Sequence, residues 1–120
     1  MKNQYTSKCC SKTEIKDSEF YGAYKIFFGT LCSESRLKII NLLRTNGKMN
    51  VSELAKKLQM NQTALSHDLN RLKKCGFVQV EIKGKYRYYK LNEKTIRPIM
   101  DLIDGHMSNY CIHILRGEIK

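Results

Sequence analysis

Two stretches with helical spacing of apolar residues, separated by a short break, lie at the centre of this chain. In the second stretch, Leu65, Leu69 and Leu72 fall on one face of a helix that continues to about residue 75. The first, over residues 51–58, has an apolar face of the same kind, and the break occupies residues 59–61. This pattern predicts a helix-turn-helix.

Two further helices are predicted before this pair. Phe20, Tyr24 and Phe27 recur at spacings of four and three, which is typical of an apolar stripe on a helix over residues 18–31. Residues 33–47 form the next helix, and its apolar face is unusually broad. We expect that helix to be the most buried one.

The pattern changes from helical to alternating after residue 76. Apolar residues at every second position and a later aromatic-rich run flank Gly84, which predicts a β-hairpin with its turn at residues 83–85. Helical spacing returns over residues 95–115. The predicted fold is therefore mainly α with a small β-hairpin, in the order α-α-α-α-β-β-α.

The last predicted helix carries a heptad-like apolar seam. Its members alternate at spacings of four and three: Ile96, Met100, Ile103, Met107, Tyr110 and Ile114. We expect the seam to pack against a second copy of the protein in a two-fold dimer, because no later segment covers it. The stripe of Phe20, Tyr24 and Phe27 is expected to join that interface. The alternative is packing of the seam against its own domain.

The face of the helix-turn-helix opposite its leucines is polar. Its uncharged side chains can exchange hydrogen bonds with base edges: Gln62, Thr63, Ser66, His67 and Asn70. Cations on the same helix and at the hairpin turn suit phosphates: Arg71, Lys73, Lys83, Lys85 and Arg87. Alone, this face also fits an ordinary surface helix. The hairpin favours nucleic acid, because Glu81 is the only acidic residue from 71 to 90.

Composition and charge indicate the class of partner. The 120 residues include 22 Lys and Arg against 11 Asp and Glu, which gives a net charge of +11. This excess predicts a polyanionic partner, double-stranded DNA above all. No apolar run is long enough to span a membrane and no signal-peptide pattern is present, so we expect a cytoplasmic protein without a membrane partner. Five cysteines without a CxxC motif fit a reducing compartment.

The domain boundaries follow the same patterns. Residues 1–16 are rich in Lys, Ser and Thr, and we expect them to form a flexible arm that contains the pair Cys9 and Cys10. Residues 17–115 form one folded domain with dimerisation helices at both ends. Residues 116–120 form a short tail.

Three sequence segments resemble the ArsR/SmtB family of transcriptional repressors. They are LCSESRLKIINLL, VSELAKKLQMNQTALSHDLNRLKKCGFV and KGKYRYYKL, and the likeness covers about residues 31–107. The resemblance implies a winged helix-turn-helix, with residues 61–75 as the recognition helix and 83–87 as the wing. It also implies a homodimer that binds an inverted-repeat operator and, in many members, releases DNA when a metal ion or metalloid binds. Asp68 departs from the family's Ser-Arg-His-Leu pattern, and we expect it to add negative charge near DNA.

Two metal sites known in the family are incomplete in this chain. The positions that match its Cys-x-Cys motif hold Asn50 and Ser52. A second family site uses Asp, His, His and Glu on paired C-terminal helices. The aligned positions here are Glu93, Thr95, His106 and Asn109. A standard zinc site is therefore not expected.

Thiols are the remaining ligands for an effector. Cys9 and Cys10 resemble the N-terminal cysteine pairs of some arsenic- or cadmium-sensing members, in which a third sulfur comes from the folded body. Soft thiolates suit soft ions, so As(III), Cd(II) and Zn(II) are the effectors to test. The third ligand is open among Cys32, Cys75 and Cys111. A cysteine pair with no sensing role is the alternative.

Two other functions fit the same fold. One is a redox or reactive-sulfur sensor that uses Cys32 and Cys111 in place of the N-terminal pair. The other is a winged helix used for protein contact or as a non-specific architectural DNA binder. An enzyme is not expected, because the sequence has no nucleophile–base pair, no phosphate-cradling Gly-rich loop and no closed metal-ligand set.

Overall fold

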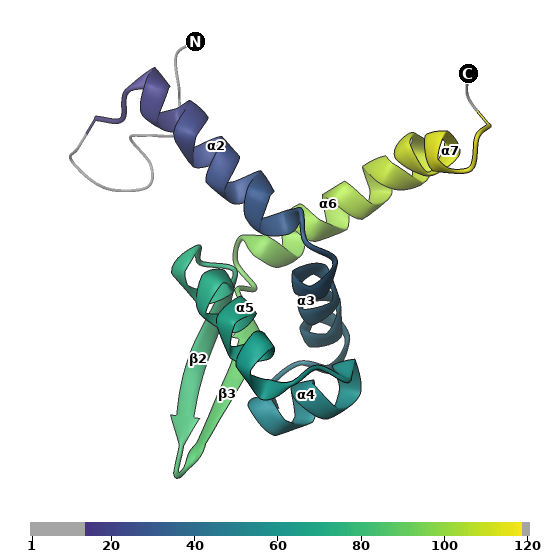
Figure 1. Ribbon diagram of the computed structural model, residues 1–120. Helices are drawn as coiled ribbons and strands as arrows, with labels where there is room; N and C mark the ends of the chain where they lie inside the picture. Colours follow the sequence, from purple (N-terminus) through teal and green to yellow (C-terminus); the bar gives the residue numbers. More distant parts are fainter. Residues whose placement is uncertain (1–13, 119–120) are drawn as a thin grey trace.

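The computed structural model describes residues 14–118. Its helices are α2 (Asp17–Leu31), α3 (Glu34–Asn46), α4 (Val51–Leu58), α5 (Gln62–Lys74), α6 (Ile96–Asn109) and α7 (Cys111–Leu115). Its strands are β1 (Met49–Asn50), β2 (Val78–Lys83) and β3 (Tyr86–Leu91). The helices α3, α4 and α5 and the β2–β3 hairpin form a body, from which α2 and α6–α7 project in different directions (Figure 1). The predicted order of helices and hairpin is confirmed.

Capping side chains explain the helix-turn-helix geometry. Asn50 Oδ1 accepts a hydrogen bond from the Glu53 N–H at 2.8 Å, and the Asn50 N–H donates to Glu53 Oε1 at 2.9 Å, so α4 begins with a capping box. Asn61 Oδ1 accepts from the Ala64 N–H at 2.7 Å and caps α5. Between the helices, Gln59 has a left-handed backbone with φ 55°. These caps fix the start of each helix and the turn between them.

The sheet has the order β1-β3-β2 with antiparallel pairing throughout. The β2–β3 pairing runs as far as Lys83 opposite Tyr86, which leaves a two-residue turn. Gly84 occupies its first position with φ 61°, a conformation that glycine adopts without strain. On the other side of β3, β1 places Asn50 opposite Tyr88. The start of α4 is therefore held against the hairpin.

The core lies where α3, α5, the sheet and the first half of α6 meet. Its fully buried apolar side chains are Ile39, Ile40, Leu43, Leu54, Leu65, Leu69, Leu72 and Phe77. The broad apolar face of α3 is buried, as its sequence predicts. Among residues 14–118, no helix combines the length and the apolar character needed to cross a bilayer.

The C-terminal segment differs from its prediction in two ways. The prediction of a single helix over residues 95–115 is wrong, because the backbone at Tyr110 (φ −128°, ψ −74°) separates α6 from α7. The assignment of Ile96 and Met100 to a dimer interface is also wrong. Each is only 4% exposed, because the first half of α6 packs into the core of its own chain. Phe27 is half-buried against Phe77, with ring centroids 5.1 Å apart.

Candidate nucleic-acid interface

The face of α5 that points away from the core carries the predicted base-reading side chains. The leucines of α5 are fully buried, which turns the opposite face to solvent. Five exposed side chains there have no hydrogen bond or ion pair with any other residue of the range 14–118: Gln62, Thr63, Ser66, His67 and Asn70. Their donors and acceptors are therefore available to base edges. Contact of these residues with DNA remains a prediction.

Asp68 does not add negative charge near DNA, so that prediction is wrong. The residue is 9% exposed, and its Oδ2 accepts a hydrogen bond from Ser35 Oγ at 2.6 Å. Its Oδ1 forms an ion pair with Arg36 Nη1 at 3.2 Å. Asp68 lies three residues after Leu65 and four before Leu72, on the buried stripe of α5. Helical periodicity alone was the signal that it points inward.

A polar network joins α5 to the end of α2. Arg36, besides its contact with Asp68, donates from Nε to the Thr30 carbonyl oxygen at 2.7 Å. Thr30 is fully buried, and its Oγ1 accepts from Arg71 Nε at 3.0 Å and lies 3.3 Å from Cys75 Sγ. The network therefore fixes α5 relative to α2. Because Nε of Arg71 is engaged in this network, only the two terminal nitrogens of its guanidinium are available for the predicted phosphate contact.

The three cations at and beside the hairpin turn, Lys83, Lys85 and Arg87, differ in their internal partners. Glu81 lies 2.7 Å from Lys48 Nζ and 3.7 Å from Lys83 Nζ. The hydrogen bond from Lys48 lowers the pKa of Glu81, which keeps its carboxylate charged beside both lysines. Lys85 and Arg87 form no ion pair with any residue in the described part of the chain. Of the three cations at the turn, they have the most charge available to a phosphate.

We expect Lys85→Ala to reduce the salt dependence of DNA binding more than Lys83→Ala does. Removing one phosphate contact lowers the slope of log K against log salt by about one. Lys83 shares Glu81, so its removal should change the slope by less. Fluorescence anisotropy titrations at several salt concentrations measure both slopes. Equal changes in the two variants would contradict the ranking.

The two projecting arms carry large apolar side chains that remain substantially exposed within the range 14–118. We call them the arm surface: Tyr21, Tyr24, Ile26 and Phe28 on α2, Leu102 and Met107 on α6, Ile114 and Leu115 on α7, and Tyr110 between α6 and α7. Their exposed fractions range from 40% for Met107 to 81% for Leu115. Phe20 and Ile103, which were predicted with this surface, are half-buried. An apolar patch of this kind is typical of a protein interface.

Sequence spacing identified only part of the arm surface. Tyr21, Ile26, Phe28, Leu102 and Leu115 were missed, because each lies off the predicted stripe. The signal on α2 was its composition: FYGAYKIFFGTL is apolar around most of the helix, so that burial of one face leaves apolar side chains elsewhere.

Residues 14–118 bring together no group of three His, Cys, Asp or Glu side chains that could hold a metal ion. Of the residues aligned with the family's C-terminal metal site, Glu93 lies 2.5 Å from Arg97 Nε. His106 lies against the ring of Tyr110, with centroids 4.7 Å apart.

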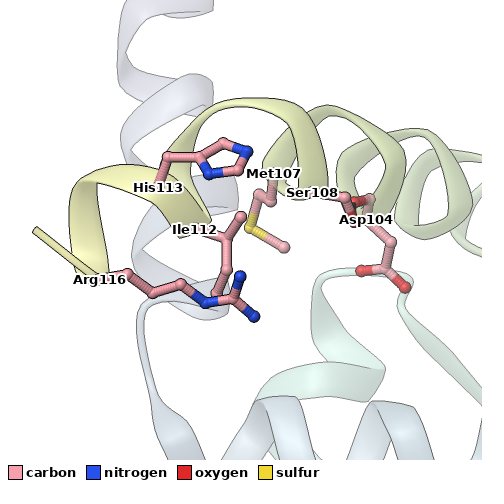
Figure 2. A pocket seen from close by; sticks show the side chains of 6 residues that line it. All are labelled: Asp104, Met107, Ser108, Ile112, His113 and Arg116. Carbon is pink, nitrogen blue, oxygen red and sulfur yellow. Dashed lines mark hydrogen bonds between the residues drawn. The ribbon is translucent and has the colours of Figure 1, made fainter. Parts of the chain in front are cut away.

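Figure 2 shows a pocket along the bend between α6 and α7. Its volume is about 470 Å³. It is lined by Asp104, Met107, Ser108, Ile112, His113 and Arg116. Asp104 is bound to Arg44 from α3. His113 Nδ1 lies 2.5 Å from Glu118 Oε1. Two polar side chains of the pocket lining, Asp104 and His113, therefore already have partners.

The thiols lie in different surroundings. Cys9 and Cys10 lie outside the described residues. Cys32, between α2 and α3, and Cys111, at the start of α7, are exposed. Cys75 is half-buried at the end of α5, where its thiol contacts Thr30.

Comparison with known proteins adds a family and a function. A sequence profile described as "Bacterial regulatory protein, arsR family" matches residues 33–80. The cadmium resistance transcriptional regulatory protein CadC of Listeria innocua is 36% identical over 63% of this chain and 64% of its own length. The arsenical resistance operon repressor of Bacillus subtilis is 30% identical over 69% of this chain and 79% of its own length.

A solved structure supports the fold. The homodimeric winged helix-turn-helix DNA-binding domain Mb0332 from Mycobacterium bovis, a possible ArsR-family transcriptional regulator, matches with a TM-score of 0.73. The match covers 84% of this chain and 93% of that one, at 22% identity. The hairpin of β2 and β3 is therefore the wing of a winged helix-turn-helix.

Proposed function

This chain belongs to the ArsR family of DNA-binding transcriptional regulators, and from that membership we propose that it is a homodimeric repressor of an inverted-repeat operator. The observation that carries the proposal is the outward face of α5, whose exposed polar side chains have no partner within residues 14–118. In a two-fold dimer, two such faces would enter the major groove about 34 Å apart. The family consists of regulators and not of enzymes.

The arm surface supports the dimer. Two arms with exposed apolar side chains leave the body in different directions (Figure 1), so a second copy related by a two-fold axis could cover both. The winged helix-turn-helix domain of Mycobacterium bovis is homodimeric. We therefore assign the arm surface to a second copy of this chain, which would cover Tyr24, Met107, Tyr110 and Ile114 among its residues.

The division of labour on DNA follows from side-chain chemistry. We propose that Gln62, Thr63, Ser66, His67 and Asn70 contact bases, and that Arg71, Lys73, Lys83, Lys85 and Arg87 contact phosphates. Because a regulator of this kind acts on chromosomal DNA, we also propose that the protein is cytoplasmic.

Selection of duplexes from a random pool tests the proposal. We expect an inverted repeat to emerge, and to bind about 1000-fold more tightly than a random duplex at the same salt concentration. His67→Ala should relax the preference at one position of each half-site, whereas Lys73→Ala should weaken both duplexes equally. Equal binding of selected and random duplexes would instead identify an architectural DNA binder.

We also propose that a soft ion on thiolates releases the operator. CadC is named as a cadmium resistance regulatory protein, and the Bacillus subtilis relative as an arsenical resistance operon repressor. This chain contains the pair Cys9 and Cys10, whose thiolates are suitable ligands for such soft ions. Cys75 is the third ligand with the most direct route to DNA binding, because its thiol contacts the network that holds α5. An ion can release the operator only if it binds more tightly to the conformation that does not bind DNA than to the conformation that does.

Arsenite or Cd(II) is expected to weaken operator binding about tenfold or more, whereas Zn(II) has a smaller effect. In a Cys9→Ser/Cys10→Ser variant, operator binding should be retained and the response lost. Cys111→Ser should keep the response if Cys75 is the third ligand, and should lose it if Cys111 is. Release by an oxidant, together with a disulfide or polysulfide at Cys32 or Cys111 by mass spectrometry, would favour the redox sensor instead.

A further inference from the structure

A cleft of about 310 Å³ lies between the start of α4 and the tip of the wing. Its lining comes from two segments far apart in the sequence: Asn50, Val51 and Ser52 on one wall, and Lys85, Tyr86 and Arg87 on the other. The sheet register explains why they meet. β1 pairs Asn50 with Tyr88. After Asn50 the chain turns into α4, whereas the residues of β3 that precede Tyr88 lie closer to the wing tip. The cleft opens where the two backbones diverge.

The lining of this cleft is cationic. It contains two positively charged side chains and no acidic one. Lys85 and Arg87 have no ion pair within residues 14–118, in contrast to Lys83 beside Glu81. The Lys85 ammonium lies 5.5 Å from the centroid of the Tyr86 ring, a cation–π contact that keeps it at the cleft without neutralising it.

The opposite wall supplies a neutral hydrogen-bond donor. The Asn50 carboxamide oxygen is engaged in capping α4. The Ser52 side chain is exposed and makes no hydrogen bond with the described residues, so its hydroxyl can donate into the cleft. The cleft therefore has a guanidinium, an ammonium and a hydroxyl around it. A phosphate monoanion readily accepts hydrogen bonds from donors of these kinds.

We propose that this cleft binds one phosphate group of the DNA backbone, held by Arg87 and Lys85 from the wing and by Ser52 from α4. The inference rests on the proposed function and deepens it, because Ser52 becomes a DNA contact and one phosphate joins the wing to the helix-turn-helix. Since α4 leads into α5 through the turn at Gln59, that phosphate also sets the register of α5 in the groove.

Ser52→Asp tests the site without disturbing the fold. An acidic residue in the first turn of a helix is favourable, so α4 should form normally. A carboxylate in the cleft repels the phosphate, and we expect affinity to fall about tenfold or more for a selected palindrome and for a random duplex alike. Ser18→Asp makes the same change of charge in the first turn of α2, which lies at the outer end of its arm (Figure 1). That control should change affinity by no more than about twofold.

Single methylphosphonate substitutions along the selected duplex locate the phosphate. We expect one uncharged linkage per half-site to weaken wild-type binding about tenfold and to have little effect on Arg87→Gln, which already lacks the contact. Ser52→Ala should reduce the same penalty. The proposed site is overturned if Ser52→Asp binds both duplexes as tightly as Ser18→Asp does, or if no linkage has a penalty that depends on Arg87.

The outcomes separate this site from the proposed function. If wild-type protein binds the selected and random duplexes equally, the sequence-specific function fails. The effect of Ser52→Asp on the random duplex still decides the cleft in that case, because a phosphate contact is independent of sequence.

Discussion

A Tyr110→Asp/Ile114→Asp variant is expected to be monomeric at micromolar concentration and to bind the operator at least about 100-fold more weakly than wild-type protein. Tyr110 is 58% exposed and Ile114 63% exposed, and both belong to the arm surface. In the proposed dimer these positions would be buried, so that an unpaired carboxylate at each of them would oppose association. Without association, the two half-sites are bound independently, and the advantage of linked binding is lost.

Light scattering gives the mass of this variant, and circular dichroism shows whether its helices persist. The matched control is Ser108→Asp/Asn109→Asp, which adds the same charge at exposed polar positions of α6 beside the seam. That variant should remain dimeric and bind the operator. A Tyr110→Asp/Ile114→Asp protein that is still dimeric would remove the arm surface from the interface.

Asp68→Ala is expected to lower the free energy of unfolding by about 2 kcal/mol or more at a fixed protein concentration. Its side chain is 12% exposed and that of Arg36 19%, so the ion pair is mostly shielded from water. Without the carboxylate, the Arg36 charge and the Ser35 hydroxyl lose a partner that they reach at 3.2 Å and 2.6 Å. Because the same network holds α5 against Thr30, we also expect poorer discrimination between operator and random duplex. Urea denaturation and anisotropy titrations measure the two effects.

Two companion variants separate charge from packing. Asp68→Asn keeps an acceptor for Ser35 and should fall between wild type and Asp68→Ala in stability. An Arg36→Met/Asp68→Leu double variant replaces the ion pair with apolar side chains of similar size, and should recover much of the stability without restoring discrimination. If Asp68→Ala unfolds at the same urea concentration as wild type, the network does not hold α5.

Local periodicity accounts for most of the fold. Leu65, Leu69 and Leu72 are buried where their spacing places them, and Asn61 caps α5 as its position indicates. Gly84 supplies the turn of the wing. These features depend on neighbours within a few residues, which is why the chain alone reveals them.

The wrong predictions concern apolar faces whose packing partner the spacing of residues does not determine. Ile96 and Met100 continue the heptad of Met107 and Tyr110, yet the first pair packs into its own chain and the second pair stays exposed. Periodicity assigns residues to a face and leaves the covering partner open. The backbone break at Tyr110 has neither proline nor glycine to signal it.

The candidate site shows the same division. The polar face of α5 follows from helical spacing, because its members lie opposite the leucines. The cleft between Ser52 and Arg87 joins segments that only the pairing of β1 with β3 brings together. A two-residue strand has too little pattern to predict that pairing.

A dimer of this chain that reads two half-sites at once should be sensitive to the spacing between them, and changing that spacing is the most direct test. Insertion of about five base pairs at the centre of the selected palindrome turns one half-site to the opposite face of the duplex. We expect the affinity to fall about 100-fold, towards that of a single half-site. Affinity that is unchanged by the insertion would contradict simultaneous binding of two half-sites by one dimer, because each half-site would then be bound on its own.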